Sequence, residues 1–191
     1  RADCSESVSG SQPNIVDGGS LVSGGIDFDG VDDELSVGSS VITSSSLFGA
    51  AVVKHNTGTI GETSEQVWGQ YASGSSGRFF LNANTSNLYA FFADATNSVS
   101  GLTAGAIGTS QTLLTSNLNG SMAEIWRDGV SQNTDDYSGF TPSTESLSIG
   151  KGGLATDYFN GNVAEIIIYN SDQSDNRVGI ETNINDHYNI Y

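Results

Sequence analysis

Short apolar runs separated by Gly, Asn, Asp and Ser recur along most of the chain, and this spacing constrains the fold more than any other feature. The runs have the length of β-strands, and the residues between them are typical of tight turns. Because no helical pattern intervenes, the strands are expected to pair antiparallel rather than through β-α-β units. The predicted strands are residues 25–28, 34–37, 49–54, 66–71, 78–81, 88–93, 111–116, 121–127, 146–150 and 161–169.

The last predicted strand contains three consecutive isoleucines, residues 166–168. Such a run is typical of a strand that is buried on both faces or covered on its back. A cover is predicted directly after it, because Ser174 suits a helix N-cap and Ile180, Ile184 and Tyr188 repeat at helical spacing. The sequence therefore predicts an all-β fold, a two-sheet antiparallel jelly-roll sandwich with one short C-terminal helix at about residues 174–188.

The length of 191 residues fits one such domain. Residues 1–20 are polar and are expected to form an extended lead-in, with the domain itself at residues 21–191. The single cysteine, Cys4, has no partner for an internal disulfide. Since the only methionine is Met122, we expect further sequence before Arg1 in the parent protein.

The formal net charge is −16, from 22 acidic and 6 basic side chains. Nucleic-acid binding needs clustered Lys and Arg, so this composition excludes it as an expected function, and it argues equally against anionic membrane surfaces. No apolar run approaches the roughly 20 residues of a membrane helix. The negative charge is compatible with a saline or calcium-rich exterior, where salt screens it. In the simpler interpretation, the charge only keeps the protein surface soluble.

Several segments, in order, resemble the laminin-G-like and concanavalin A-like jelly-roll domains. Residues 26–37 are similar to the opening signature of laminin-G-like domains, with Glu34 where an aromatic residue is usual. Residues 112–130 resemble paired strands around an Asp-Gly turn, and residues 147–150 and 158–170 resemble the closing strands. Domains of this type occur in virion proteins of marine phages and in secreted bacterial proteins. The resemblance implies a surface- or carbohydrate-binding module, often with bound calcium, at an extracellular or virion surface.

No catalytic residues are predicted. Glycosidases need two carboxylates placed across one bond, and the acidic run that marks retaining enzymes of similar sandwiches is missing. Glu124 and Glu165 lie on predicted strands and are the remaining candidates, with a structural or solvent-facing role as the alternative. His55 and His187 lack zinc-ligand spacing.

A calcium site is predicted at the acidic turn, because hard cations prefer clustered carboxylate oxygens. The expected ligands are Asp27, Asp29, Asp32 and Asp33. In the alternative interpretation, Asp29 and Asp32 only accept hydrogen bonds from backbone N–H groups of the turn.

A sugar site needs an exposed aromatic ring beside polar side chains. The ligand-binding candidates are Tyr137, Tyr158 and Trp68, with Tyr71 as a further aromatic candidate. Tyr137 and Tyr158 lie in polar, loop-like sequence that favours exposure, whereas core packing is the alternative for Trp68. We expect a non-enzymatic virion adhesion or decoration module whose partner is a glycan or another virion or cell-surface protein, compatible with a homo-oligomer. The alternative is a carbohydrate-binding module of a secreted bacterial protein, and a glycoside hydrolase is the third hypothesis.

Overall fold

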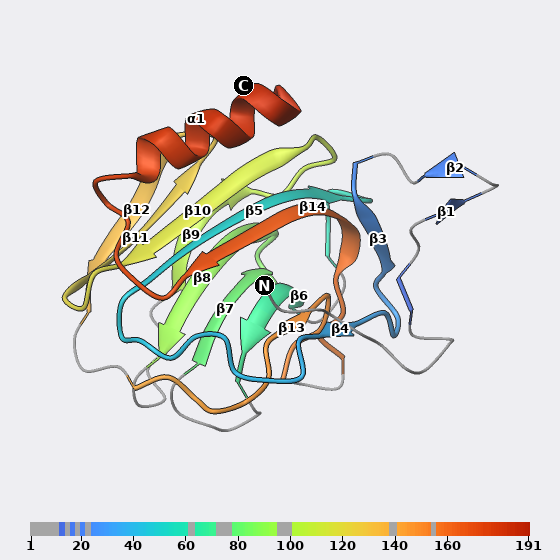
Figure 1. Ribbon diagram of the computed structural model, residues 1–191. Helices are drawn as coiled ribbons and strands as arrows, with labels where there is room; N and C mark the ends of the chain where they lie inside the picture. Colours follow the sequence, from blue (N-terminus) through green and yellow to red (C-terminus); the bar gives the residue numbers. More distant parts are fainter. Residues whose placement is uncertain are drawn as a thin grey trace.

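The computed structural model describes residues 12–13, 16–17, 20–21, 24–60, 64–71, 78–94, 101–137, 141–153 and 156–191. Two six-stranded antiparallel sheets pack face to face, and one helix lies on the outer face of one of them (Figure 1). The predicted all-β sandwich with a single short C-terminal helix is therefore confirmed for the described residues.

The sheet beneath the helix is called sheet B, and the opposite sheet is called sheet A. Sheet B has the strand order β12 (Val130–Asp136), β11 (Met122–Arg127), β10 (Thr112–Leu118), β5 (Leu47–His55), β14 (Asn160–Tyr169) and β3 (Ile26–Asp29). Sheet A has the order β4 (Leu35–Ser36), β13 (Ser148–Ile149), β6 (Glu65–Gln70), β7 (Arg78–Ala83), β8 (Leu88–Asp94) and β9 (Gly101–Ala106). Strands β1 (Val16–Asp17) and β2 (Ser20–Leu21) form a separate two-stranded hairpin within the expected lead-in.

All predicted strands are present with small shifts of their ends, whereas β9 and β12 were not predicted. The core between the sheets consists of large apolar side chains that strand alternation directs inward. Trp68 is 1% exposed, and its ring centroid lies 6.3 Å from that of Phe91. Gly49 makes room for this indole, because a Cβ there would lie 2.9 Å from it.

The hairpin between β11 and β12 turns at Asp128 and Gly129, whose φ angles are 51° and 75°. Positive φ at both central residues defines the type I′ turn that the Asp-Gly pair predicts. In the equivalent pair before β11, only Gly120 has positive φ, 90°. There Asn119 Oδ1 accepts the N–H groups of Ser121 and Met122 instead, so this Asn-Gly pair does not form a second type I′ turn.

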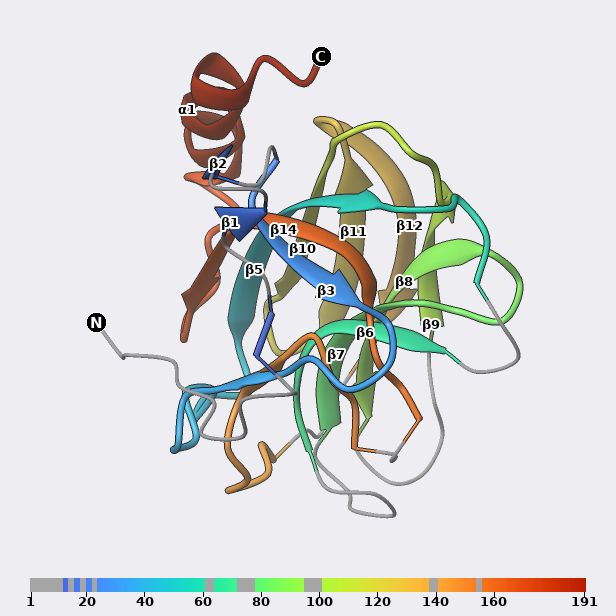
Figure 2. The same cartoon turned by 90° about the vertical axis from the view of Figure 1, so that its right-hand side faces the viewer.

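Helix α1 spans Arg177–Tyr188 and begins three residues later than expected. Its N-cap is Asn176, while the Ser174 hydroxyl donates to Asp172 Oδ1, so the predicted Ser174 cap was wrong. The predicted apolar stripe does face the sheet: Ile184 is buried, with Ile180 and Tyr188 beside it, against Phe48, Ala50, Val52 and Leu113. Both views show α1 above the outer face of sheet B (Figures 1 and 2).

Strand β14 is flanked differently along its length. Residues Asn160 to Val163 pair with β3 on one side, and β5 pairs along the strand on the other side. From Ala164 to Tyr169, no strand of the described chain pairs with β14 on the side away from β5. Ile166, Ile167 and Ile168 are only partly buried, so the alternative of burial on both faces was wrong. The other alternative, a cover on the back of the strand, is confirmed, because Ile167 packs on the cluster that contains Ile184 of α1.

Candidate functional site

The outer face of sheet A gathers aromatic, basic and amide side chains that are distant in the sequence. On β7, Phe79 and Leu81 point into the core, so Arg78, Phe80 and Asn82 point outward. The ring of Tyr71, just after β6, packs on Phe80 with a centroid distance of 4.9 Å. The Arg78 guanidinium carbon lies 5.8 Å from the centre of the Tyr71 ring, a cation–π distance.

A second half of this face is built by the segment around Lys151. The Gln66 side chain lies flat over Gly69, where a Cβ would come within 2.1 Å of its Nε2. From there Gln66 Nε2 donates to the Lys151 carbonyl oxygen at 3.0 Å. Lys151 forms an ion pair with Glu34, and its Nζ lies 5.6 Å from the centre of the Tyr158 ring. The hydrogen bond from Lys151 to Glu34 raises the pKa of the ammonium group.

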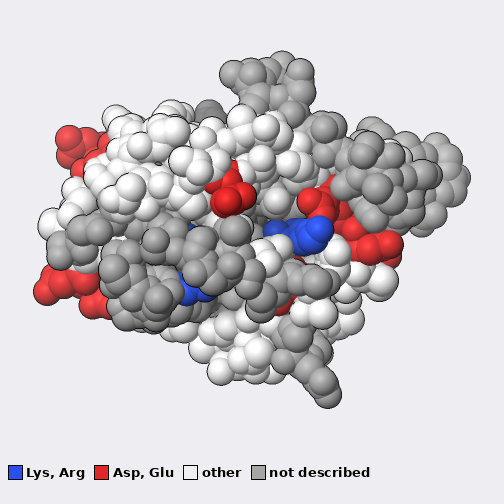
Figure 3. Space-filling view, turned by 90° about the horizontal axis from the view of Figure 1, so that it is seen from below, with Lys and Arg blue, Asp and Glu red and all other residues white. Residues whose placement is uncertain are grey.

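We call these residues the sheet A platform: Glu34, Gln66, Tyr71, Arg78, Phe80, Asn82, Lys151 and Tyr158. Tyr71 and Tyr158 are both half-buried, so part of each ring reaches the surface. Asn82 is 4% exposed, and its Oδ1 has no hydrogen-bond partner among the described residues. Seen from below, basic side chains on the described surface lie next to acidic ones (Figure 3). The half-buried Tyr71 and Tyr158 rings, with Arg78 and Lys151 beside them, are what this arrangement can offer a ligand at the surface. Gln66, Phe80 and Asn82 are only 2%, 8% and 4% exposed and lie beneath these groups.

The acidic turn after β3 brings three of the four predicted calcium ligands together. One carboxylate oxygen from each of Asp29, Asp32 and Asp33 lies within 4.8 Å of the others. Asp29 Oδ1 accepts the N–H groups of Val31 and Asp32, and Asp33 Oδ2 accepts the N–H of Asp29. Burial raises the pKa of the Asp33 carboxyl, and the neighbouring aspartates raise it further.

Asp27 lies outside this group of carboxylates. Its Oδ1 accepts hydrogen bonds from Asn56 and Asn162 on the outer face of sheet B, both at 3.2 Å. The hydrogen bonds of Asp29 and Asp33 engage one oxygen of each carboxylate, so oxygens of the right chemistry for calcium are present at the turn. Both expected roles, metal ligand and turn capping, are therefore compatible with the geometry.

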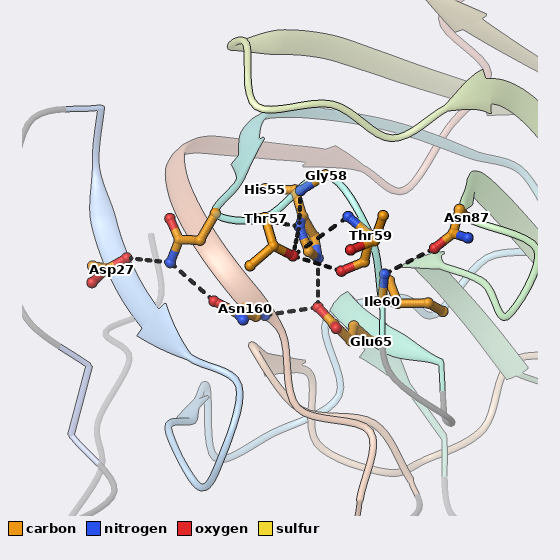
Figure 4. Close-up of polar contacts among 10 residues, drawn as sticks. Asp27, His55, Thr57, Gly58, Thr59, Ile60, Glu65, Asn87 and Asn160 are labelled. Atoms are coloured by element: carbon orange, nitrogen blue, oxygen red, sulfur yellow. Dashed lines mark hydrogen bonds and ion pairs between the residues drawn. The ribbon is translucent and has the colours of Figure 1, made fainter.

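A buried polar pair joins the two sheets beside this turn (Figure 4). His55 at the end of β5 is fully buried, and its Nε2 lies 2.8 Å from Glu65 Oε2 on β6. His55 Nδ1 accepts the N–H groups of Thr57 and Gly58, which places the ring proton on Nε2. Glu65 Oε2 also accepts the N–H of Asn160 on β14 at 3.0 Å. One carboxylate oxygen thus links three strands of the two sheets.

The predicted ligand-binding residues separate into two groups. Trp68 and Tyr137 are 1% and 9% exposed and belong to the core, so the exposure expected for Tyr137 was wrong. Tyr158 lies on the sheet A platform. Tyr71, a further sequence candidate, also lies on the platform. Sequence reasoning missed Arg78 and Phe80, although the position of Phe80 next to the inward-facing Phe79 on a strand was a usable signal.

The two candidate carboxylates of a glycosidase do not meet. Glu124 lies on β11 and Glu165 on β14, with β10 and β5 between them. Three steps of about 4.8 Å between strands place the two backbones about 14 Å apart. Retaining and inverting enzymes need their carboxyl groups at roughly 5 Å and 6.5–9.5 Å, respectively. This pair therefore does not have the spacing of a glycosidase.

The chain matches no protein-family model and no curated protein. Its fold is similar to several solved structures. The carbohydrate-binding module CBM40 of the Ruminococcus gnavus IT-sialidase, bound to α2,3-sialyllactose, matches with a TM-score of 0.60 and 12% identity over 74% of this chain and 84% of that one.

Two further structures are similar at comparable levels. Domain 4 of the extracellular arabinanase AbnA from Geobacillus stearothermophilus, in complex with arabinotriose, matches with a TM-score of 0.63 and 11% identity, over 82% of this chain and 75% of that one. A heptameric SAP-like pentraxin from Limulus polyphemus matches with a TM-score of 0.61 and 10% identity, over 80% of this chain and 78% of that one. At these identities the likeness shows the fold alone, a two-sheet antiparallel β-sandwich. The described helix is too short to cross a membrane.

Proposed function

We propose that this protein is a carbohydrate-binding module and that the sheet A platform is its binding face. The observation that carries the proposal is the joined arrangement of Tyr71, Phe80 and Arg78 on one sheet, with Lys151 and Tyr158 beside it. Two of the structural neighbours were solved with sialyllactose and arabinotriose, which supports a glycan as the ligand class.

The physical basis is the match between sugars and mixed surfaces. A pyranose ring has an apolar face that packs on an aromatic ring, while its hydroxyls need polar partners at the sides. Tyr71 is fixed by Phe80, and Gln66 is fixed by its bond to the Lys151 carbonyl. Such preorganised groups lose little conformational entropy when a ligand binds.

A glycan array followed by titration calorimetry tests the proposal. Tyr71→Ala removes an aromatic ring of the platform and should weaken binding of the selected glycan at least about tenfold, equal to about 1.4 kcal/mol. The matched control is Tyr191→Ala, which removes a 53% exposed tyrosine far from the platform in the sequence and should leave affinity unchanged. Equal losses in both variants, or no glycan bound by the unaltered protein, would contradict the proposal.

The finer expectations from the sequence remain proposals. We propose an extracellular setting, and a role as a virion adhesion or decoration domain stays a prediction that the parent gene and its neighbours would test. Calcium at Asp29, Asp32 and Asp33 is likewise proposed, supported by the three converging carboxylates. The absence of enzymatic activity is a prediction that hydrolysis assays on arabinan and β-glucan would test.

A further inference from the structure

Among the described residues, the C-terminal half of β14 is a sheet edge without a paired strand. Beyond Val163, where the pairing with β3 stops, every second residue of the strand directs its N–H and C=O groups outward, and no described strand receives them. The Ala164 carbonyl is engaged by the Tyr188 hydroxyl at 3.3 Å. Natural proteins rarely leave a long apolar edge open, because it pairs with other chains.

The side chains of this half-strand have the composition of a central strand. Ile166, Ile167 and Ile168 follow one another, and each is only partly buried. Ile166 and Ile168 pack on the core between the sheets, and Ile167 packs on the cluster beneath α1. The sequence therefore encodes burial on both faces, and the described chain supplies only part of it.

Hollows flank this edge on both sides. Two of them, of about 290 and 360 Å³, lie between β14 and α1 and share Asn183 and Ile184. A third, of about 230 Å³, opens into the sandwich below the edge and is apolar except for Glu165; its lining is Ile26, Phe28, Leu35, Ile149, Val163, Ala164, Glu165 and Ile166. The outermost part of sheet B at β14 is visible beneath α1 in Figure 2. A strand added here would direct alternate side chains into the groove under α1 and into the apolar hollow.

We infer that the edge of β14 from Ala164 to Tyr169 is a docking site for an extended peptide of a partner protein, which adds a strand to sheet B. Charge selects the kind of peptide. Glu165 is the only Asp, Glu, Lys or Arg among the described residues that line the three hollows, and the chain carries a net charge of −16. The expected peptide alternates apolar residues, for the hollow below, with neutral or basic residues, for the groove beside Glu165.

A second copy fits less well. It would bring another net charge of −16, and its own Ile166 and Ile168 already pack in its own core, so the hollows would stay unfilled. Of the segment before β3, the described Gly25 lies against the backbone of Val163 and Ala164, and β2 pairs with β1, so the lead-in as an occupant is one outcome of the test.

The test uses an acetylated and amidated octapeptide in which valine alternates with lysine, with the full chain as its receptor. Amide hydrogen exchange at residues 164–169 should slow at least tenfold with saturating peptide, and the same peptide with glutamate in place of lysine should have no effect. Glu165→Arg should weaken binding at least tenfold. Its matched control is Glu124→Arg, another half-buried glutamate on a strand of sheet B, which should change affinity less than twofold.

Three results would overturn the inference. Unchanged exchange at millimolar lysine peptide would exclude strand addition. Exchange that slows with protein concentration alone would assign the edge to a second copy. Exchange that is already slow in the free protein, and becomes fast when residues 1–23 are deleted, would assign the edge to the chain's own lead-in.

Discussion

The buried Glu65 carboxylate should be among the most sensitive polar positions of the molecule. Replacing Glu65 with Leu removes the acceptor of two buried donors, His55 Nε2 and the backbone N–H of Asn160. Each buried donor left without a partner costs about 1–3 kcal/mol. Since leucine regains part of this loss by apolar burial, we expect the free energy of unfolding to fall by about 2–4 kcal/mol.

Glu65→Gln is the matched variant. The amide oxygen of glutamine can accept both hydrogen bonds, so neither donor is left unpaired. What is lost is the charge assistance of these bonds, and neutral bonds are about half as strong as charged ones. The expected destabilisation is about 1–2 kcal/mol, clearly smaller than that of Glu65→Leu.

Urea unfolding monitored by tryptophan fluorescence measures this difference, because Trp68 lies in the core near these strands. The midpoint should shift while the slope with denaturant stays constant, which shows that stability rather than compactness has changed. If Glu65→Leu were as stable as Glu65→Gln, the carboxylate would not be the hydrogen-bonding centre that joins the two sheets, and the reasoning would fail.

Three further predictions follow from other parts of the chain. If calcium binds at Asp29, Asp32 and Asp33, millimolar calcium should raise the melting temperature relative to EDTA, and equal temperatures would reject a site of ordinary affinity. Burial raises the pKa of Glu181 above its ordinary value of 4.5, so the folded state holds this proton more tightly. The free energy of unfolding should therefore fall as pH rises through the window above 4.5, and Glu181→Gln should flatten that slope in urea titrations at several pH values. Gly161→Ala places a Cβ 2.3 Å from the Lys54 carbonyl and should cost about 3 kcal/mol in thermal unfolding, whereas Gly179→Ala, with open space around it, should be neutral or stabilising by up to about 1 kcal/mol.

The sequence predicted the sandwich well because its inner strands carry apolar residues with clear punctuation between them. It did not predict β9 and β12, which are outer strands of their sheets. β12 is exposed along its whole length and reads Val-Ser-Gln-Asn-Thr-Asp-Asp, so it has no apolar face to recognise. β9 is rich in Gly and Ala. β9 forms because it pairs with β8, and β12 forms because it pairs with β11. Such pairing cannot be recognised from the residues of the strand itself.

The candidate sites differ in how far they depend on local sequence. Asp29, Asp32 and Asp33 lie within one turn, so proximity in the chain was enough to predict their convergence. The sheet A platform brings Tyr71 into one surface with Lys151 and Tyr158, which lie 80 and 87 positions further along the chain. The contact between His55, Glu65 and Asn160 spans 105 positions, and only the register of the sheets creates it. Aromatic residues were harder to place, because Tyr137 and Tyr158 both lie in polar, loop-like sequence, yet Tyr137 is buried and Tyr158 is half-buried.

The isoleucine run of β14 shows how a prediction that fails can still be informative. Local sequence and global fold usually agree in natural proteins, and a conflict between them marks a functional feature more often than an error of design. Here the local pattern is typical of a central strand, while the second half of β14, from Ala164 to Tyr169, has a described neighbour on one side only. The conflict disappears if one more strand is added, and hollows already exist on both sides where its side chains would lie. The same residues that contradict the simplest expectation therefore define what a partner must supply, which is backbone to pair with β14 and apolar side chains at every second position.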